Sequence, residues 1–296
     1  YVLNENIDGS EKLLDQAEVF IGFFTRNFGQ YPWVKEKLGI VNTPYWGMEH
    51  QTIIAYGNEY KDNERGYDFL LLHEMAHEWW GNYLSVGDWS DFWIHEGFAV
   101  YSEALFIEEK FGVGEYNSFF KKNLLKKIPQ YKPIVLNRNA TMKQVAGLDP
   151  YYKGAFVLHM LRYLIGDEDF FKVIKEFLHS KKKVPDNQVS TSDFIDIVHN
   201  TIGENIDWFF EVYLYEKKYP ILIKDINHGS NHTFVELSWK NKGFAMPVEV
   251  FYKSNTGFTQ KKLVITNEPT MIAIPQYNQI KIDPDKRILL TLDKKE

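Results

Sequence analysis

The segment His73-Glu74-Met75-Ala76-His77 places two imidazoles and a carboxylate where they could carry out metal chemistry. In a helix, His73 and His77 lie four residues apart and therefore project from the same face. Two imidazoles arranged in this way can both reach one zinc ion, at roughly 2.0–2.1 Å each. Glu74 is rotated away from that face by one residue, so it is better placed to contact a water molecule on the metal than the metal itself. We therefore predict that the histidines are ligands and that Glu74 acts as the general base.

A third ligand is expected at Glu96, which lies 19 residues after His77 in the sequence Trp93-Ile94-His95-Glu96-Gly97-Phe98-Ala99. Two histidines, one carboxylate and an open fourth position form a catalytic zinc site, whereas structural zinc sites use all four positions. The alternative is that both histidines are ordinary helix residues and that Glu74 is a solvated charge. The helix around them is apolar on nearly every side, which predicts burial, and buried histidines and glutamates need partners. One zinc ion per chain would supply them.

The composition is that of an ordinary globular protein. The chain has 296 residues, of which 44% are hydrophobic and 25% are charged. Its net charge of −6 argues against non-specific binding to nucleic acid. It contains no cysteine, which excludes disulfides and thiolate metal sites. No run of residues approaches the roughly 18 apolar residues that a membrane span requires. A soluble protein is therefore expected.

The first residues, Tyr1-Val2-Leu3, do not look like a natural start, so the chain is expected to come from a longer protein. No signal peptide is visible in it, although one could precede it in the parent. A parent with a signal would be periplasmic or secreted, and a cytoplasmic location also remains compatible with the sequence. The compartment therefore stays open.

Hydrophobic periodicity predicts the elements that must position these residues. Helices are expected at about 10–27, 67–80, 91–111, 115–127, 151–165, 168–180, 192–201 and 205–215, with Asp91 as the cap of the third of them. Short strands are expected at 34–41 and 52–56. Beyond residue 219 the pattern changes to alternation, which predicts strands at 222–223, 233–239, 248–252, 262–266, 271–274, 280–282 and 288–292.

Two domains follow from this change of pattern. Residues 1–218 are expected to form a mostly helical catalytic domain with a small strand-containing lobe. Residues 219–296 are expected to form a small β-sandwich, because seven short strands separated by turns are typical of that fold. The predicted class is thus α+β.

Other residues could assist the chemistry. A tyrosine at the start of a helix, in Tyr151-Tyr152-Lys153-Gly154, could donate a hydrogen bond to an oxyanion. On the residues alone, an ordinary aromatic role for these tyrosines remains the stronger reading, because the chain holds 18 tyrosines. Glu103 lies seven residues after Glu96 on the same helix face and could accept a hydrogen bond from a ligand imidazole. A plain surface role is the alternative.

Together these motifs resemble the aminopeptidase N-like family of zinc metallopeptidases, the gluzincin group that also includes leukotriene hydrolase. The resemblance rests on H-E-x-x-H, the spacing to Glu96, Trp79-Trp80-Gly81-Asn82, the Trp-x-x-Glu-Gly-Phe-Ala segment and Tyr-x-Lys-Gly. It covers essentially the whole chain. It implies a thermolysin-like catalytic domain, and it implies that Tyr151 rather than Tyr152 stabilises the transition state.

The family also carries a Gly-x-Met-Glu-Asn segment that binds the free amino terminus of the substrate. Here it reads Trp46-Gly47-Met48-Glu49-His50, so Trp46 and His50 depart from the pattern. The resemblance implies that Glu49 and the free side of Glu96 pair with the α-ammonium group, and that Gly47 and Met48 line the substrate. The Asn that usually precedes the third ligand is His95.

The leading hypothesis is therefore an aminopeptidase that acts on peptides with a free amino terminus. An endopeptidase of the wider gluzincin type is an alternative. A catalytically weak fragment that serves as a binding module is another, although all the ligands are present. The family's N-terminal β-domain and C-terminal helical domain are absent from this chain, so turnover is expected to be poor without them. Nothing in the residues points to an epoxide hydrolase activity.

Overall fold

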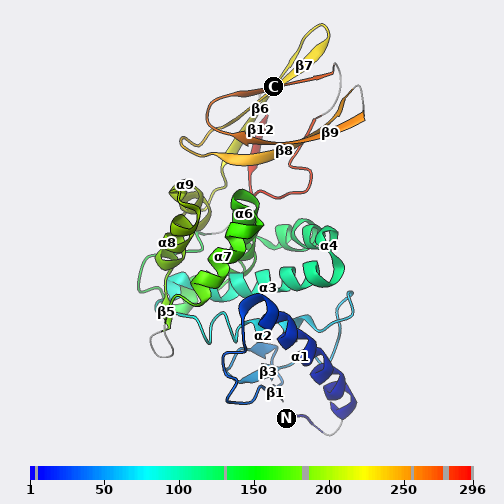
Figure 1. Cartoon of the computed structure of the whole chain (residues 1–296), viewed down its shortest axis with the longest axis vertical. Coiled ribbons are helices and arrows are strands. Elements are labelled where there is room, and N and C mark those ends of the chain that lie inside the picture. Colours follow the sequence, from blue (N-terminus) through cyan, green and yellow to red (C-terminus); the bar gives the residue numbers. More distant parts are fainter. Residues whose placement is uncertain (4–5, 130–131, 182–186, 255–256, 276–279, 295–296) are drawn as a thin grey trace.

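The computed structural model describes residues 1–3, 6–129, 132–181, 187–254, 257–275 and 280–294. Up to residue 215 most of the chain is helical, and from Ile221 onward it consists of strands. Figure 1 shows the strand-rich part at one end of the molecule, the helices in the middle, and a small sheet near the N-terminus at the other end. The site residues predicted from the sequence lie in the helical middle and the small sheet.

The helical part begins with α1 (Ile7–Phe28). The later α-helices are α2 (Phe69–Ala76), α3 (Trp93–Phe111), α4 (Val113–Ser118), α5 (Met142–Val145), α6 (Gly154–Ile165), α7 (Asp167–Leu178), α8 (Thr191–Ile202) and α9 (Asp207–Phe210). Shorter helical turns of 3-10 or π type are η2 (Trp89–Asp91), η3 (Phe119–Leu124), η4 (Leu125–Lys127), η5 (Asp149–Lys153) and η6 (Glu211–Tyr215). Large aromatic residues fill the core between them, including Phe24, Trp79, Trp93 and Phe98.

Two predictions about helix ends are wrong. The helix predicted at 67–80 spans only Phe69–Ala76, with His77 as its C-cap. Asp91 does not cap the next helix, because α3 begins at Trp93 and its N-cap makes no side-chain hydrogen bond. The Asp91 carboxylate instead accepts hydrogen bonds from Arg138 Nη1 and Thr191 N, both at 3.0 Å. Because its partners lie far away in the sequence, one of them at the first residue of α8, the carboxylate is not available to the start of α3.

A small three-stranded sheet precedes α2. It consists of β1 (Gly39–Asn42), β2 (Gly47–Met48) and β3 (Ile53–Tyr56) in the order β1-β3-β2. The strand predicted at 34–41 is wrong in its first half, because a turn closed by the 2.8 Å bond from Glu36 N to Trp33 O occupies that region. β2 runs antiparallel to β3, so residues 49–52 form the turn of a hairpin.

The close approach of α3 to η5 and α6 depends on two glycines. A Cβ atom added to Gly97 would lie 3.0 Å from the Cα of Gly154 and 3.2 Å from Pro150 O. A Cβ added to Gly154 would lie 3.0 Å from the Cα of Gly97. The two backbones therefore touch with no side chain between them. Since Glu96 and Tyr151 flank this contact in the sequence, it brings the third predicted ligand near the predicted tyrosine.

Replacing Gly97 by alanine is expected to lower the free energy of unfolding by about 1–3 kcal/mol, because the new methyl group would meet backbone atoms that cannot rotate away. Thermal or urea unfolding measures the change. Gly114→Ala is the matched control, since a Cβ in that helix meets nothing within 4 Å and alanine favours helix by up to about 1 kcal/mol. Equal stability of the two variants would contradict the proposed role of the glycine contact.

The C-terminal part contains β6 (Ile221–His228), β7 (His232–Trp239), β8 (Met246–Ser254), β9 (Gly257–Ile265), β10 (Thr270–Pro275), β11 (Ile280–Ile282) and β12 (Thr291–Lys294). They form a four-stranded sheet, β10-β7-β6-β12, and a three-stranded sheet, β11-β8-β9. Buried residues of both sheets, such as Val235 and Val250, belong to one core. This is the sandwich arrangement that the alternating pattern predicted, whereas the domain boundary at 218 remains a prediction.

The strand predicted at 288–292 is wrong at its start. Ile288 and Leu289 are buried, but they lie in a loop that precedes β12. The Asp283 carboxylate shapes that loop by accepting hydrogen bonds from the backbone N–H groups of Arg287 and Ile288. Among the described helices, none is both long enough and apolar enough to cross a membrane.

Candidate active site

The start of α2 is held in place by Asp68. Its carboxylate accepts a 2.9 Å hydrogen bond from Leu71 N, which caps the helix. The same carboxylate accepts hydrogen bonds from the Tyr56 hydroxyl and, at 3.0 Å, from Asn58 Nδ2. Tyr56 ends β3, so this buried acid ties the helix that carries the histidines to the small sheet.

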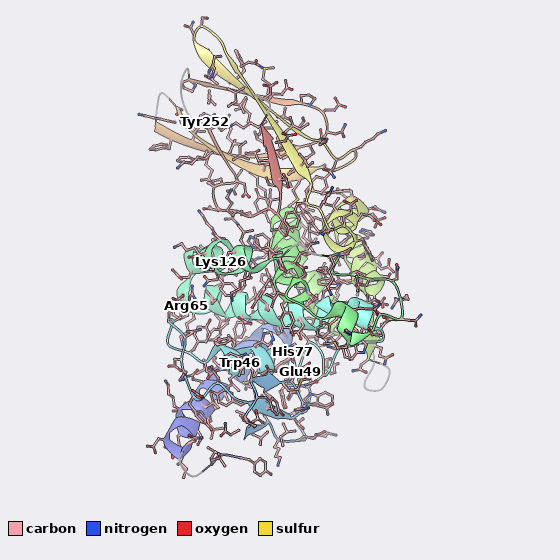
Figure 2. All side chains as sticks on the ribbon, turned by 180° about the vertical axis from the view of Figure 1, so that it is seen from behind. Trp46, Glu49, Arg65, His77, Lys126 and Tyr252 are labelled. Atoms are coloured by element: carbon pink, nitrogen blue, oxygen red, sulfur yellow. The ribbon has the colours of Figure 1, made fainter. Side chains whose placement is uncertain are left out.

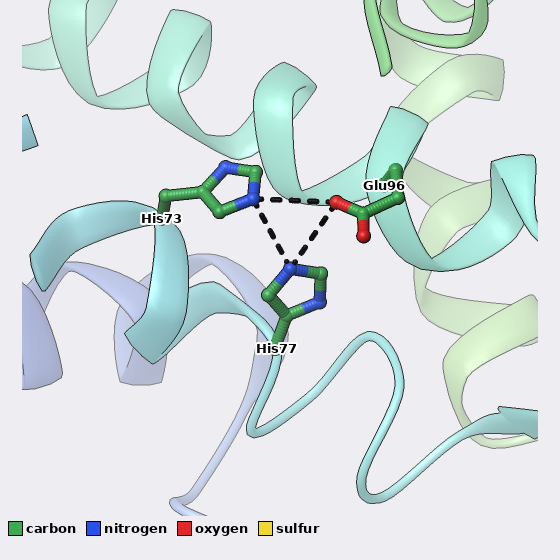
Figure 3. Close-up of side chains that lie close together, drawn as sticks. All are labelled: His73, His77 and Glu96. Atoms are coloured by element: carbon green, nitrogen blue, oxygen red, sulfur yellow. Dashed lines mark hydrogen bonds and ion pairs between the residues drawn. The ribbon is translucent and has the colours of Figure 1, made fainter. Parts of the chain in front are cut away.

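Three side chains converge at the C-terminal end of α2 (Figure 3). His73 Nε2 lies 3.2 Å from His77 Nε2 and 3.3 Å from Glu96 Oε2, and His77 Nε2 lies 3.5 Å from the same oxygen. Two ligands of one tetrahedral zinc ion, each at roughly 2.0–2.1 Å, are about 3.3 Å apart. The spacing of the three atoms therefore fits a single ion of this kind.

The Nδ1 atoms of the two histidines already have hydrogen-bond partners, which leaves both Nε2 atoms for the centre of the site. His73 Nδ1 donates to Glu103 Oε1 at 2.8 Å, and His77 Nδ1 donates to Trp80 O at 2.8 Å. With both Nδ1 atoms protonated, neutral rings present lone pairs at both Nε2 atoms. Glu96 Oε2 is buried and has no hydrogen-bond partner among the described residues. When the rings are neutral these lone pairs repel one another, and a metal ion between them supplies the positive charge that protons on the rings otherwise provide.

The charges around the site also favour a cation. Burial alone would lower the pKa of His73, but Glu103 and Glu96 hold it well above its usual value. Burial likewise acts to lower the pKa of His77, which Glu96 and Glu49 raise to about 9. Burial acts to raise the pKa of Glu96, yet the two histidines hold it far below its usual range. Carboxylates thus surround the imidazoles and create a negative potential.

Glu74 is the predicted general base, and its carboxylate is buried beside the same site. Burial, more than any other cause, raises the pKa of Glu74 to about 7. Its Oε2 atom has no hydrogen-bond partner among the described residues. Gly47 of β2 packs so closely that a Cβ there would overlap Glu74 Oε1 and lie 2.9 Å from Leu70 Cδ1. The strand therefore confines Glu74 on one side and leaves its free oxygen available for a proton.

The hairpin turn after β2 places Glu49 beside Glu74 and His77. Ligand atoms of Glu49, Glu74 and His77 all lie within 4.8 Å of one another. Figure 2 labels Glu49 and His77 close together, in the same region as Trp46. A pocket of about 340 Å³ opens here, and Met48 lines it together with these residues. Trp46 is 58% exposed, and the centroid of its ring lies 5.8 Å from that of Phe69. This departure from the family pattern therefore adds an aromatic side chain to the pocket lining.

The two neighbouring tyrosines have different surroundings. The Tyr151 ring stacks on the His73 ring, with centroids 6.2 Å apart and an angle of 14° between the planes. Burial, followed by the negative charge of Glu96, raises the pKa of Tyr151, so its hydroxyl keeps its proton. The Tyr152 ring lies under Lys127 Nζ, which is 4.9 Å from its centroid. Tyr151 is therefore the tyrosine that contacts the predicted ligand His73.

Sequence reasoning assigned no function to Glu78, which the structure places in a buried position beside His77. Its Oε1 atom accepts a 2.9 Å hydrogen bond from Thr52 N. The two residues are 26 positions apart, and no motif connects them. His95 is also buried, and its Nε2 atom accepts a hydrogen bond from Val86 N at 3.2 Å, which gives that departure from the family pattern a structural role.

Comparisons with known proteins agree with this arrangement. The sequence pattern described as "Peptidase family M1 domain" matches residues 14–213. Human aminopeptidase B is 26% identical over 194 residues, which cover 60% of this chain and 29% of that protein. Aminopeptidase M1-B of rice is 24% identical over 238 residues, 74% of this chain and 27% of that protein. The chain thus spans less than a third of the length of these curated relatives.

Solved structures support the fold. Aminopeptidase A of Legionella pneumophila, crystallised in complex with aspartic acid, superposes with a TM-score of 0.73 at 17% sequence identity. The match covers 99% of this chain and 35% of that one. The predicted α+β class and the resemblance to aminopeptidase N-like enzymes are both confirmed. Since the family pattern covers most of the residues from α1 to η6, the chain belongs to peptidase family M1.

Proposed function

We propose that the chain is the zinc-dependent catalytic region of an aminopeptidase, which hydrolyses the first peptide bond of peptides with a free amino terminus. Residues 1–218 would form its catalytic domain and residues 219–296 its β domain. One observation carries the choice of an aminopeptidase: the Glu49 carboxylate lies within 4.8 Å of ligand atoms of Glu74 and His77. An acid at that distance can pair with an α-ammonium group one residue away from the bond that is cleaved.

His73, His77 and Glu96 would hold the zinc ion. Bound there, zinc supplies Lewis-acid chemistry, which lowers the pKa of a water molecule from about 15.7 toward 7 and polarises a carbonyl oxygen. Glu103 orients one ligand by accepting the Nδ1 proton of His73. Such orienting contacts hold the ligand geometry fixed while the reaction proceeds.

The protein's own groups then move the protons. Glu74 accepts a proton from the attacking water and returns it to the leaving amine, a double role suited to a buried carboxylate beside the ligands whose Oε2 atom has no other hydrogen-bond partner among the described residues. Tyr151 keeps its proton and can donate a hydrogen bond to the oxyanion that forms from the attacked carbonyl. Glu49, with the free side of Glu96, pairs with the α-ammonium group. Gly47 and Met48 supply an extended backbone beside which a peptide can lie as an added strand.

The proposed activity is tested with pairs of aminoacyl amides that differ only in N-acetylation. The chain, loaded with zinc, is expected to hydrolyse the free amine of each pair and to leave the acetylated one intact. Equal turnover of both would remove the aminopeptidase assignment. Cleavage inside blocked peptides would favour the endopeptidase alternative.

Replacing Tyr151 by phenylalanine is expected to lower kcat by roughly 10²–10³-fold, as the loss of one oxyanion donor does in other hydrolases. KM should change much less, because the hydroxyl acts in the transition state. Tyr152→Phe is the matched control, since that ring also lines the pocket but lies under Lys127 Nζ, whereas the Tyr151 ring stacks on His73. A similar loss of kcat in both variants would argue against a specific donor at position 151.

A further inference from the structure

Glu78 is a buried acid that the proposed chemistry does not use. Glu78 directly follows the proposed ligand His77 in the sequence, and the residue is 1% exposed. Among the described residues, it belongs to neither group of side chains that could share a metal ion. Its carboxylate is instead directed at the backbone, where Oε1 accepts the 2.9 Å hydrogen bond from Thr52 N. Its Oε2 atom is buried and has no hydrogen-bond partner among the described residues, so the Thr52 N–H is the contact that holds the carboxylate. The acid is therefore fixed on the side facing the small sheet.

Thr52 lies in the hairpin turn that carries Glu49. The turn joins β2 to β3 and includes residues 49–52. Thr52 has a φ angle of 61°, which is unfavourable for a β-branched residue and persists only where the surroundings enforce it. Two contacts do so: its N–H donates to Glu78, and its carbonyl accepts from Gly39 N at 2.8 Å. Loss of the Glu78 contact would free one side of the turn.

We propose that Glu78 is a positioning residue for amino-terminus recognition, because it fixes the turn that carries Glu49 relative to the helix end that carries His77. This inference rests on the proposed aminopeptidase function. One short path of bonds then determines the separation between the amine anchor and the zinc ligands: Glu49, three residues of turn, the bond from Thr52 to Glu78, and the adjacent His77. Figure 2 shows the two ends of this path, Glu49 and His77, close together.

The test measures recognition of the amine separately from catalysis. Zinc-loaded protein is titrated by calorimetry with leucine hydroxamate and with N-acetyl-leucine hydroxamate, which share the metal-binding group and differ in the amine. The Kd of the acetylated compound divided by the Kd of the free amine reports how much the free amine contributes to binding. Three proteins are compared: the native chain, Glu78→Gln, which keeps an oxygen acceptor for Thr52, and Glu78→Leu, which has a similar size and accepts no hydrogen bond.

We expect Glu78→Gln to keep the native ratio and Glu78→Leu to lower it about tenfold, the size of effect typical when an orienting contact is lost. Zinc content should be equal in all three proteins. A native ratio in Glu78→Leu would overturn the inference, and so would an equal loss in Glu78→Gln. No preference for the free amine in the native chain would instead contradict the proposed aminopeptidase function.

A second variant keeps the inference testable if Glu78→Leu does not fold. Glu78→Asp retains the negative charge but withdraws the carboxylate by one methylene group, so it no longer reaches Thr52 N. It is expected to lower the ratio of the two Kd values severalfold at unchanged zinc content. A native ratio in this variant would overturn the role of the Thr52 contact.

Discussion

Glu74→Gln is expected to lower kcat/KM for a free aminoacyl amide by about 10²–10⁴-fold, the usual contribution of a general base. Glutamine has nearly the same shape as glutamate but cannot accept the proton of the attacking water. The side chain lies beside Gly47 in a confined space, so the substitution should leave its surroundings in place. Steady-state kinetics on zinc-loaded protein measure the loss.

The zinc content of the Glu74→Gln protein is the control for that experiment. Glu74 does not belong to the group formed by His73, His77 and Glu96, so the variant should bind one zinc ion per chain, as the native protein is expected to do. Mass spectrometry under native conditions reports this number. Persistent activity in a zinc-loaded variant would exclude Glu74 as the base.

Glu96→Ala is expected to abolish both zinc binding and hydrolysis. It removes one of the three atoms whose separations fit a tetrahedral ion, and it leaves two imidazoles facing each other at 3.2 Å. A catalytic zinc site with only two protein ligands does not hold its metal well. Elemental analysis of the purified variant and an activity assay in the presence of added zinc measure the two effects.

Glu103→Ala is the matched comparison for Glu96→Ala. Both variants lose a carboxylate that interacts with His73, but of the two only Glu96 belongs to the group of side chains that could hold a metal ion. The loss of an orienting carboxylate is expected to weaken zinc affinity or activity by roughly 10–100-fold without abolishing either. If Glu96→Ala retained full zinc content, the assignment of the third ligand would be wrong.

Local helix geometry was enough to predict which of the candidate side chains lie on the same side. A spacing of four residues places His73 and His77 on one face, and a spacing of seven places Glu103 on the same side of α3 as Glu96. The choice between Tyr151 and Tyr152 could not be made in this way, because both lie in the same turn. It required the family resemblance, and in the structure Tyr151 stacks on His73.

The features that the sequence did not predict depend on contacts between distant parts of the chain. Asp91 looks like a helix cap, but its carboxylate is occupied by Arg138 and Thr191. Ile288 follows the alternation of a strand, yet Asp283 holds its backbone N–H in a loop. Glu78 carries no signal at all, because its partner Thr52 lies in another element. Local patterns contain no information about such partners.

The contact between Gly97 and Gly154 restricts how this protein can diverge. No side chain separates the two backbones, so mutation cannot adjust the distance between the acid ligand and the tyrosine by small steps. Changes in substrate preference are therefore expected at residues such as Trp46 and Met48, which are exposed and line the pocket. Trp46, which replaces a glycine of the family pattern, is an example of that freedom.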